Sequence, residues 1–337
     1  MQIAPESFDA SRLKALPKAE VHLHLEGCFD AALIGQWARS EGVTLPRPQE
    51  DLFRFSGLAD FLGFLDLACG LAGTTERLVE LSYGLCRRLA DNGTGYADVI
   101  FNPTHWHAWH GRLGPMLDAI DAGFRQAEQD GLPRVGVCVS LLRTQSADAA
   151  AELVDLLTTL RHPRVVAVSV DGNEATAGRT GPRFADAFRR AADAGLRRTV
   201  HAGESSGPEG VRDAVELLGA DRIDHGVRAI EDPVVVRMLA DRQIPLGVCP
   251  TSNLVLGVYP SLQDHPIERL RKAGVRVSVN TDDPALLGAS LVGEYALCAR
   301  EFGWTEATIR SVARTSIESS FATLDVKADL LTALQSW

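Results

Sequence analysis

The 337-residue sequence lacks the features that mark secreted, membrane-bound and disulfide-rich proteins. No stretch approaches the roughly 18 uninterrupted apolar residues of a membrane-spanning helix, and residues 1–20 contain no apolar signal-peptide segment. The six cysteines are widely spread and form no CxxC pair, so neither a disulfide framework nor a zinc ribbon is indicated. We therefore expect a cytoplasmic protein with reduced, mostly buried thiols.

Excess basic charge, internal repeats, low-complexity tracts and linkers are also missing. The net charge of −10 disfavours nucleic acid or an anionic membrane as the main partner. With 45% hydrophobic and 23% charged residues, the chain is long enough to bury one large core. We expect residues 1–337 to form a single domain that acts on a small molecule, and no sequence pattern fixes an oligomeric state.

Eight short apolar or β-branched runs alternate with stretches of helical periodicity. This alternation predicts an α/β protein of the (β/α)8 TIM-barrel class, whose strands end at one functional face. The expected helices include residues 75–91, 113–130, 147–161 and 182–194. The expected strands are residues 20–25, 96–102, 134–141, 165–171, 198–204, 222–225, 245–249 and 275–281.

Two further segments extend the predicted barrel. Residues 27–73 separate the first strand from its helix, which is too long for a bare βα loop, so we expect an insertion with its own short helices at the position of a lid. Within it, residues 55–68 have helical spacing that fits either packing onto the barrel or an apolar gate containing Phe61. Residues 286–337 are expected to form closing helices after the last strand.

Histidines and an aspartate at the ends of separate runs predict a metal site. His22 and His24 are two residues apart on a strand and therefore share a face, although two interior histidines satisfied by hydrogen bonds would show the same spacing. His201 ends the fifth run, and Asp282 follows the eighth. Three nitrogens and one oxygen suit zinc, and a position left open for water would make the site catalytic.

A second group of residues would surround that water. Glu204 follows His201 by three residues and suits a proton shuttle, unless it is a salt-bridged rim residue. His225 ends the sixth run and would orient or deprotonate the attacking water, unless it is a satisfied core group. Asp283 would hydrogen-bond a substrate nitrogen, and Gly172 exposes a backbone N–H that a ligand can approach closely.

These segments together resemble the adenosine and adenine deaminase family, a group of zinc-dependent TIM barrels that hydrolyse the 6-amino group of purines. The matching segments are residues 17–27 (PKAEVHLHLEG), 201–204 (HAGE), 224–226 (DHG), 249–253 (CPTSN) and 280–284 (NTDDP). The resemblance implies one zinc ion per chain, held by His22, His24, His201 and Asp282. It also implies that Glu204 handles the proton at purine N1, His225 acts on the attacking hydroxide, Asp283 contacts N7 and the Gly172 N–H contacts N3.

Three alternatives compete with this interpretation. His24-Leu25-Glu26 matches the H-x-E half of the cytidine deaminase signature, but the P-C-x-x-C half is missing. Many binuclear amidohydrolase barrels bridge two metals with a carboxylated lysine on the fourth strand, whereas the lysines here lie only at 14, 18, 272 and 327. A non-catalytic barrel that binds a nucleoside or zinc would need neither Glu204 nor His225.

Glu26 is the main departure from the adenosine branch of the family. Strict adenosine deaminases usually carry aspartate at this position, whereas adenine and aminodeoxyfutalosine deaminases tend to carry glutamate. Residues 249–253 and 280–283 are closer to the adenosine branch. The sequence therefore ranks adenosine or deoxyadenosine narrowly first, with adenine, aminodeoxyfutalosine and N6-substituted adenines as alternatives.

The loop at residues 102–110 contains three histidines and two tryptophans. A plain surface loop is its simplest interpretation, and a second metal at His105, His107 and His110 is the least favoured. As a functional role, we expect Trp106 or Trp109 to form an aromatic wall at the far end of the substrate pocket.

Overall fold

The computed structural model describes residues 8–337, without the side chains of residues 58 and 59, and its core is a parallel β-barrel. The first seven residues of the predicted domain lie outside the described residues. Eight strands pair in chain order from β1 to β8, and the bridge between Leu23 and Asp282 brings the ends of the sheet together. This arrangement confirms the predicted (β/α)8 barrel. The strands are β1 Lys18–His24, β2 Thr94–Phe101, β3 Arg134–Leu142, β4 Val165–Asp171, β5 Arg197–Ala202, β6 Arg222–His225, β7 Leu246–Val248 and β8 Val277–Val279.

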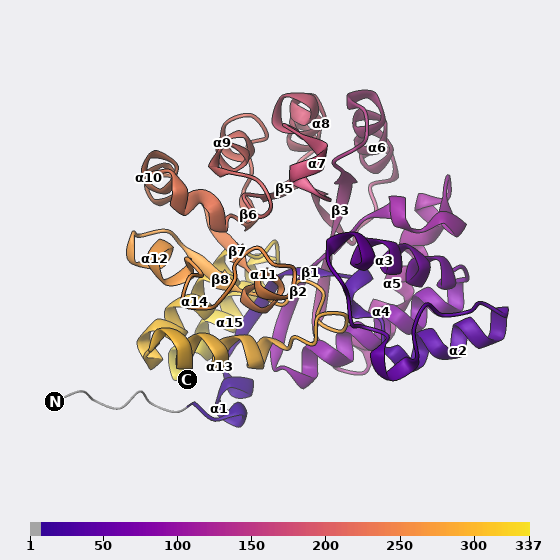
Figure 1. Ribbon diagram of the computed structural model, residues 1–337, viewed down its shortest axis with the longest axis horizontal. Coiled ribbons are helices and arrows are strands. Elements are labelled where there is room, and N and C mark those ends of the chain that lie inside the picture. The colour runs from indigo at the N-terminus through magenta and orange to yellow at the C-terminus, as the bar shows by residue number, and fades with distance from the viewer. Residues whose placement is uncertain (1–7) are drawn as a thin grey trace.

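Helices surround the strands, and Figure 1 shows them as an outer layer. Their sequences explain where several begin, because Thr74 and Ser146 accept hydrogen bonds from backbone N–H groups at the starts of α4 and α6. The helices are α1 Ala10–Ala15, α2 Ala31–Glu41, α3 Leu58–Leu71, α4 Thr75–Asp91, α5 Leu113–Gln129, α6 Ala147–Leu160, α7 Glu174–Ala177, α8 Gly181–Asp193, α9 Pro208–Glu216, α10 Pro233–Asp241, α11 Pro250–Val255, α12 Ile267–Lys272, α13 Leu291–Phe302, α14 Glu306–Ser319 and α15 Leu324–Ser336. Short 3-10 turns are η1 Glu26–Cys28, η2 Gln49–Asp51, η3 Pro103–His105, η4 His107–Trp109 and η5 Val227–Glu231.

The insertion after β1 is helical, as predicted, and contains α2 and α3. Phe61 and Leu65 on α3 are buried in the hydrophobic core, and the ring of Phe61 lies edge-on to Phe55 at a centroid distance of 5.2 Å. Phe61 and Leu65 also line a cavity at the mouth of the barrel. Packing onto the barrel and covering the cavity are therefore two roles of one helix.

The helices after β8 close the barrel at the amino end of β1, as predicted. The hydroxyl of Ser316 on α14 accepts a hydrogen bond from the backbone N–H of Ala19 on β1 at 3.1 Å. The indole N–H of Trp337 donates to the carbonyl of Arg12 at 3.2 Å, which brings the C-terminus beside α1 (Figure 1). Within residues 8–337, no helix has the length and apolar character needed to cross a membrane.

Candidate active site

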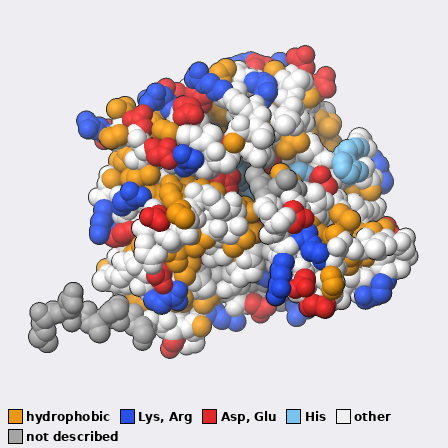
Figure 2. Space-filling model, viewed as in Figure 1, with side chains coloured by type: hydrophobic (Ala, Val, Ile, Leu, Met, Phe, Trp, Pro, Cys, Tyr) orange, Lys and Arg blue, Asp and Glu red, His pale blue; other side chains and the backbone are white. Residues whose placement is uncertain are grey.

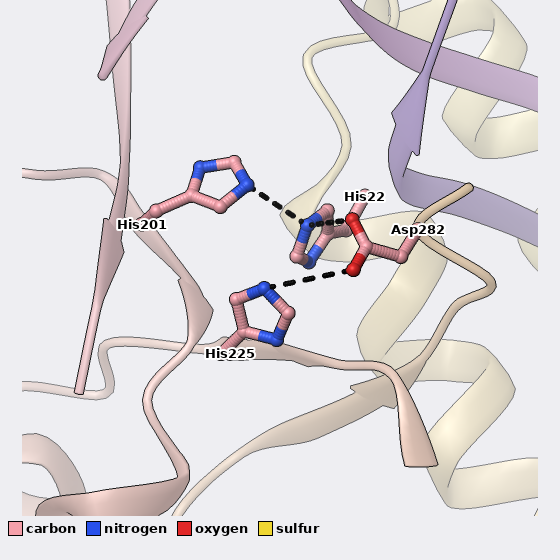
Figure 3. Close-up of side chains that lie close together, drawn as sticks. All are labelled: His22, His201, His225 and Asp282. Carbon is pink, nitrogen blue, oxygen red and sulfur yellow. Dashed lines mark hydrogen bonds and ion pairs between the residues drawn. The ribbon is translucent and has the colours of Figure 1, made fainter. Parts of the chain in front are cut away.

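The four predicted metal ligands converge at the carboxyl ends of β1, β5 and β8. The Nε2 atom of His201 lies 3.1 Å from Nε2 of His22 and 3.0 Å from Nε2 of His24. Oδ1 of Asp282 lies 3.1 Å from Nε2 of His22 and 3.3 Å from Nε2 of His24. Figure 3 shows His22, His201 and Asp282 pointing toward one another, with His225 beside them. Three nitrogens and one oxygen therefore surround a common point.

This geometry fits a tetrahedral metal ion. Ligand bonds of about 2.0–2.1 Å place tetrahedral ligand atoms roughly 3.3 Å apart, which is close to the four distances observed. Without an ion, the lone pairs of several imidazoles and a carboxylate would face one another in a site from which water is largely excluded. The donor set of nitrogen and oxygen atoms is the one that zinc accepts in catalytic sites.

Contacts behind the ligands fix their orientation. Nδ1 of His22 lies 2.9 Å from the carbonyl of Gly247, so it donates there and leaves the lone pair of Nε2 toward the centre. The hydroxyl of Ser252 donates to Oδ2 of Asp282 at 2.6 Å, which leaves Oδ1 for the ligand cluster. Asp282 itself has a φ of 66°, a left-handed conformation that costs an ordinary residue energy and that often occurs at functional sites.

His225 lies on the other side of Asp282, with its Nε2 atom 3.8 Å from Oδ2 of Asp282 and 3.5 Å from Oε1 of Glu204. The Nδ2 atom of Asn253 is 3.2 Å from Nδ1 of His225, and an amide nitrogen can only donate. Neutral His225 therefore carries its proton on Nε2. Burial, followed by the charge of His22, lowers the pKa of His225 well below its usual value, which favours this neutral form.

Glu204 and Asp283 face the same space as His225. Burial is the main reason that the pKa of Glu204 is raised to about 8, and the charge of Asp282 adds to it. Burial and the charge of Asp282 also raise the pKa of Asp283, whose Oδ1 atom is buried without a hydrogen-bond partner. Only glycine fits at position 27, because a Cβ there would lie 2.3 Å from Cα of Asp283. This close approach positions Asp283 against the end of β1.

A cavity of about 330 Å³ opens from this cluster toward the insertion helix. Figure 2 shows acidic and histidine side chains at the hollow near the centre of this face. Gly172 has a φ of 98°, which only glycine adopts readily, and its backbone borders the cavity. The lining residues are His24, Glu26, Phe61, Leu62, Leu65, Asp66, Asn102, His105, Leu142, Thr144, Asp171, Gly172, Asn173, Thr176, His201, Glu204, His225, Leu256, Asp282 and Asp283.

Trp106 is the predicted substrate-binding residue that does not line this cavity. Its ring is fully buried, packs against Phe29 and Phe101, and donates its indole N–H to Oε1 of Glu26 at 2.8 Å. The expected aromatic wall is therefore not formed by Trp106, because the turn η3 folds the ring inward behind Glu26. Trp109 also points away, and its indole N–H donates to the carbonyl of Ala72.

The histidines of the loop after β2 do not form a second metal site in the described part of the chain. Among the described residues, the metal-binding side chains that gather closely are His22, His201, His225 and Asp282, none of them from this loop. His24 adjoins this group through His201 and Asp282, whereas His225 is farther from Asp282, at 3.8 Å, and is not one of the predicted ligands. His105 instead pairs with Asp66 at 2.7 Å, while His107 and His110 are exposed and in contact with each other.

Several residues that shape the site were not among the predicted site residues. Asn102 and Asp171 line the cavity and are joined by a hydrogen bond of 2.5 Å between Nδ2 and Oδ1. Both stand at the carboxyl ends of predicted strands, and this position is itself the signal that marks functional residues in a barrel. Arg143 and Glu174 lie behind the cavity wall, and no local pattern points to them.

Comparison with known proteins gives the same family as the motifs. A sequence model described as adenosine deaminase matches residues 17–337. A protein of Agrobacterium fabrum named adenine deaminase is 36% identical over 324 residues, which cover 95% of this chain and 98% of that protein. The crystal structure of an adenine deaminase from Arthrobacter aurescens has a TM-score of 0.89 and 31% identity, covering 96% of this chain and 99% of that one.

A zinc-bound amidohydrolase from Burkholderia ambifaria also has a TM-score of 0.89, with 27% identity and coverage of 100% of this chain and 93% of that one. The likeness thus extends over the whole barrel, including every segment that contributes to the metal-ligand cluster. The non-catalytic alternative is set aside on this basis. The chain belongs to the adenosine deaminase family and is a metal-dependent hydrolytic deaminase.

Proposed function

We propose that this protein hydrolyses adenine to hypoxanthine and ammonia with one zinc ion held by His22, His24, His201 and Asp282. Bound there, zinc would lower the pKa of a coordinated water and so supply a nucleophile near neutral pH. Protonated Glu204 donates to the ring nitrogen N1, and His225 orients the attacking water through Nε2. Asp283 and the Gly172 N–H hold the remaining ring nitrogens.

One oxygen atom of Glu26 is the main support for adenine as the proposed substrate. Glu26 is 1% exposed and lines the cavity, and its Oε1 atom accepts hydrogen bonds from the backbone N–H of Asn102 and from Trp106. Its Oε2 atom is buried and has no partner. A buried acceptor without a donor is costly. Adenine bears an N9–H that satisfies such an acceptor, whereas N9 of adenosine carries ribose and has no hydrogen.

The charges around the cavity support an uncharged substrate. None of the described residues that line it is lysine or arginine, while six are aspartate or glutamate: Glu26, Asp66, Asp171, Glu204, Asp282 and Asp283. Phosphate groups are bound by cationic side chains or by backbone N–H groups at helix N-termini. The lining therefore disfavours nucleotides, including N6-substituted ones, relative to a free base.

The relatives named adenine deaminase favour the same substrate. The sequence motifs alone ranked adenosine narrowly first, and the free Oε2 atom of Glu26 reverses that order. Aminodeoxyfutalosine, which carries a large N9 substituent, is disfavoured for the same reason as adenosine.

Ammonia release from a panel of substrates tests this proposal. The panel contains adenine, adenosine, deoxyadenosine, N6-methyladenine, AMP, N6-methyl-AMP and aminodeoxyfutalosine. We expect the highest kcat/KM with adenine. A higher kcat/KM with adenosine, or no release from adenine by protein that contains zinc, would overturn the substrate assignment.

A further inference from the structure

Backbone pairing between β4 and β5 has a gap at the end of the barrel that carries the active site. These two strands pair only at Ala167 with Arg197 and at Val168 with Arg198. By contrast, β3 and β4 stay paired as far as Leu142 and Asp171. Two groups of the site follow this gap, since Gly172 comes directly after β4 and Glu204 comes two residues after β5. Backbone hydrogen bonds between strands do not hold these two groups together.

The side chain of Arg143 spans the gap. Its residue is 3% exposed, and its Nε atom donates to the carbonyl of Gly172 at 3.0 Å. One terminal nitrogen donates to the hydroxyl of Thr180 at 2.9 Å, and the other donates to the carbonyl of His201 on β5. The rigid, planar guanidinium thus joins the ends of β4 and β5, in a manner that a single ammonium group cannot reproduce.

Glu174 forms the second half of this bridge. It stands at the start of α7, three residues after the end of β4, and is 5% exposed. Its Oε1 atom accepts from the N–H of Gly203 at 3.0 Å, and its Oε2 atom accepts from the N–H of Glu204 at 2.9 Å and of Ser206 at 3.3 Å. One buried carboxylate therefore holds the backbone that carries Glu204.

The two halves of the bridge meet in a second cavity of about 380 Å³, which lies between α8 and α9 and shares only His201 with the lining of the proposed substrate cavity. Nη2 of Arg143 lies 3.9 Å from Oε1 of Glu174, and both residues line this cavity. Burying two opposite charges side by side costs desolvation energy that their attraction offsets only with well-formed hydrogen bonds. Such a pair is weak support for stability, and its contacts with the site point to a functional use.

We infer that Arg143 and Glu174 are positioning residues for the deamination, which together fix the Gly172 N–H and the Glu204 carboxyl group relative to the metal ligands. Arg143 acts on Gly172 and on His201, and Glu174 acts on Glu204. Neither side chain lines the substrate cavity, so both act through other residues. This inference rests on the proposed role of Glu204 as the proton donor.

The variant Glu174→Gln tests the carboxylate. Glutamine has the same shape but only one acceptor oxygen. It therefore cannot accept hydrogen bonds both from the N–H of Gly203 and from the N–H groups of Glu204 and Ser206. We expect kcat to fall about 100-fold, the loss expected for a misplacement of about 1 Å, with metal content and KM within a few-fold of wild type. The control is Glu209→Gln, because Glu209 is exposed and lines the same second cavity.

The variant Arg143→Lys tests the bridge itself. Lysine keeps the positive charge, so a purely electrostatic role predicts wild-type kinetics, whereas the positioning role predicts a lower kcat and a higher KM through Gly172. Wild-type kinetics for Arg143→Lys or Glu174→Gln would overturn the inference. A loss of rate that follows a loss of bound metal would also overturn it, because the role would then be structural.

The choice of assay substrate and a measurement without turnover separate this inference from the substrate assignment. All variants are assayed with the purine that wild-type protein deaminates fastest, so a wrong substrate leaves the comparison intact. Hydrogen exchange of residues 203–206 provides a readout without turnover: Glu174→Gln should speed exchange at these amides, and Glu209→Gln should not. Unchanged exchange in Glu174→Gln would contradict the inference even if the proposed function holds. A fully active Glu204→Gln would instead contradict the proposed function.

Discussion

The indole N–H of Trp106 donates to Oε1 of Glu26 at 2.8 Å, and this contact decides how the carboxylate faces the substrate cavity. The backbone N–H of Asn102 donates to the same oxygen at 2.7 Å. Two donors on one oxygen fix the plane of the carboxylate and leave Oε2 as the acceptor without a partner. Trp106, which was predicted to contact the substrate, therefore orients Glu26. In our proposal, Glu26 is the residue that contacts the substrate.

Replacing the indole N–H of Trp106 should lower kcat/KM for adenine. In Trp106→Phe the ring still fills the buried space, but Glu26 loses a hydrogen bond to a charged group worth roughly 1.5–3 kcal/mol. We expect kcat/KM for adenine to fall about 10-fold or more with unchanged metal content. Trp109→Phe is the matched control, because the indole of Trp109 donates to the carbonyl of Ala72 outside the cavity. Equal kinetics for the two variants would contradict the role of Trp106.

Shortening Glu26 should change the preference between base and nucleoside. In Glu26→Asp the carboxylate is one methylene shorter, so it cannot keep both the bond from Trp106 and a bond to the N9–H of adenine. We expect the ratio of kcat/KM for adenine to that for adenosine to fall 10–200-fold, the usual range for one methylene. If the ratio stays at the wild-type value, Glu26 does not select the substrate.

Much of the fold could be predicted because its elements are encoded locally. The run at residues 165–171 and the amphipathic segment at residues 75–91 appear in the structure as β4 and α4 with the predicted bounds. Strands β7 and β8 are shorter than predicted, at Leu246–Val248 and Val277–Val279. After β8, the side chains of Asn280 and Thr281 hydrogen-bond to β1, at the N–H of Val21 and the carboxylate of Glu20. Composition does not reveal where strand pairing gives way to such contacts.

The candidate site residues predicted at strand ends do lie together in the structure, whereas residues whose contacts join distant segments were not predicted. The motif at residues 249–253 was noted only because of the family resemblance. In the structure, Ser252 hydrogen-bonds to Asp282 and Asn253 hydrogen-bonds to His225. Arg143 could not be recognised, because its partners Gly172 and His201 are 29 and 58 residues away in the chain. The inward path of Trp106 depends on the turn η3, whose direction no periodicity encodes.

Loss of one ligand should remove the metal. His24 is near both His201 and Asp282, so His24→Ala leaves three ligands and one additional open position. We expect the purified variant to lose most of its metal and its activity, with one zinc ion per chain in the wild type by elemental analysis. His107→Ala is a control in an exposed histidine of the loop after β2. Two tightly bound ions per wild-type chain, or full metal and rate in His24→Ala, would contradict the proposed ligand set.

Glu204 should affect the rate and its pH dependence, with metal content unchanged. If Glu204 donates the proton to N1, then Glu204→Gln should lose roughly 10²–10⁴-fold in kcat. Burial raises the pKa of Glu204 to about 8, so the proton-donating form predominates below that pH. With zinc bound, the charge of the ion lowers this pKa, so the wild-type kcat should decline as pH rises through a value below 8. A rate within a few-fold of wild type in Glu204→Gln would assign the proton transfer to another group.

Glu294 on α13 should make folding stability depend on pH. It is 1% exposed, its Oε2 atom accepts from the N–H of Thr251 at 3.3 Å, and burial raises its pKa from 4.5 to about 7. Between these values the folded protein binds this proton more tightly than the unfolded chain, so the free energy of unfolding decreases as pH rises from 4.5 to 7.

The variant Glu294→Gln keeps an acceptor for Thr251 and removes the titrating group. Relative to wild type, its free energy of unfolding should therefore rise by roughly 1–3 kcal/mol between pH 5 and pH 8. Urea unfolding of both metal-loaded proteins at the two pH values measures this difference. Glu301→Gln, an exposed site on the same helix, should follow the wild-type pH dependence. If Glu294→Gln also follows it, the Glu294 carboxyl group is not protonated in the folded protein at pH 5 to 7, and the energetic cost of its burial is met by another contact.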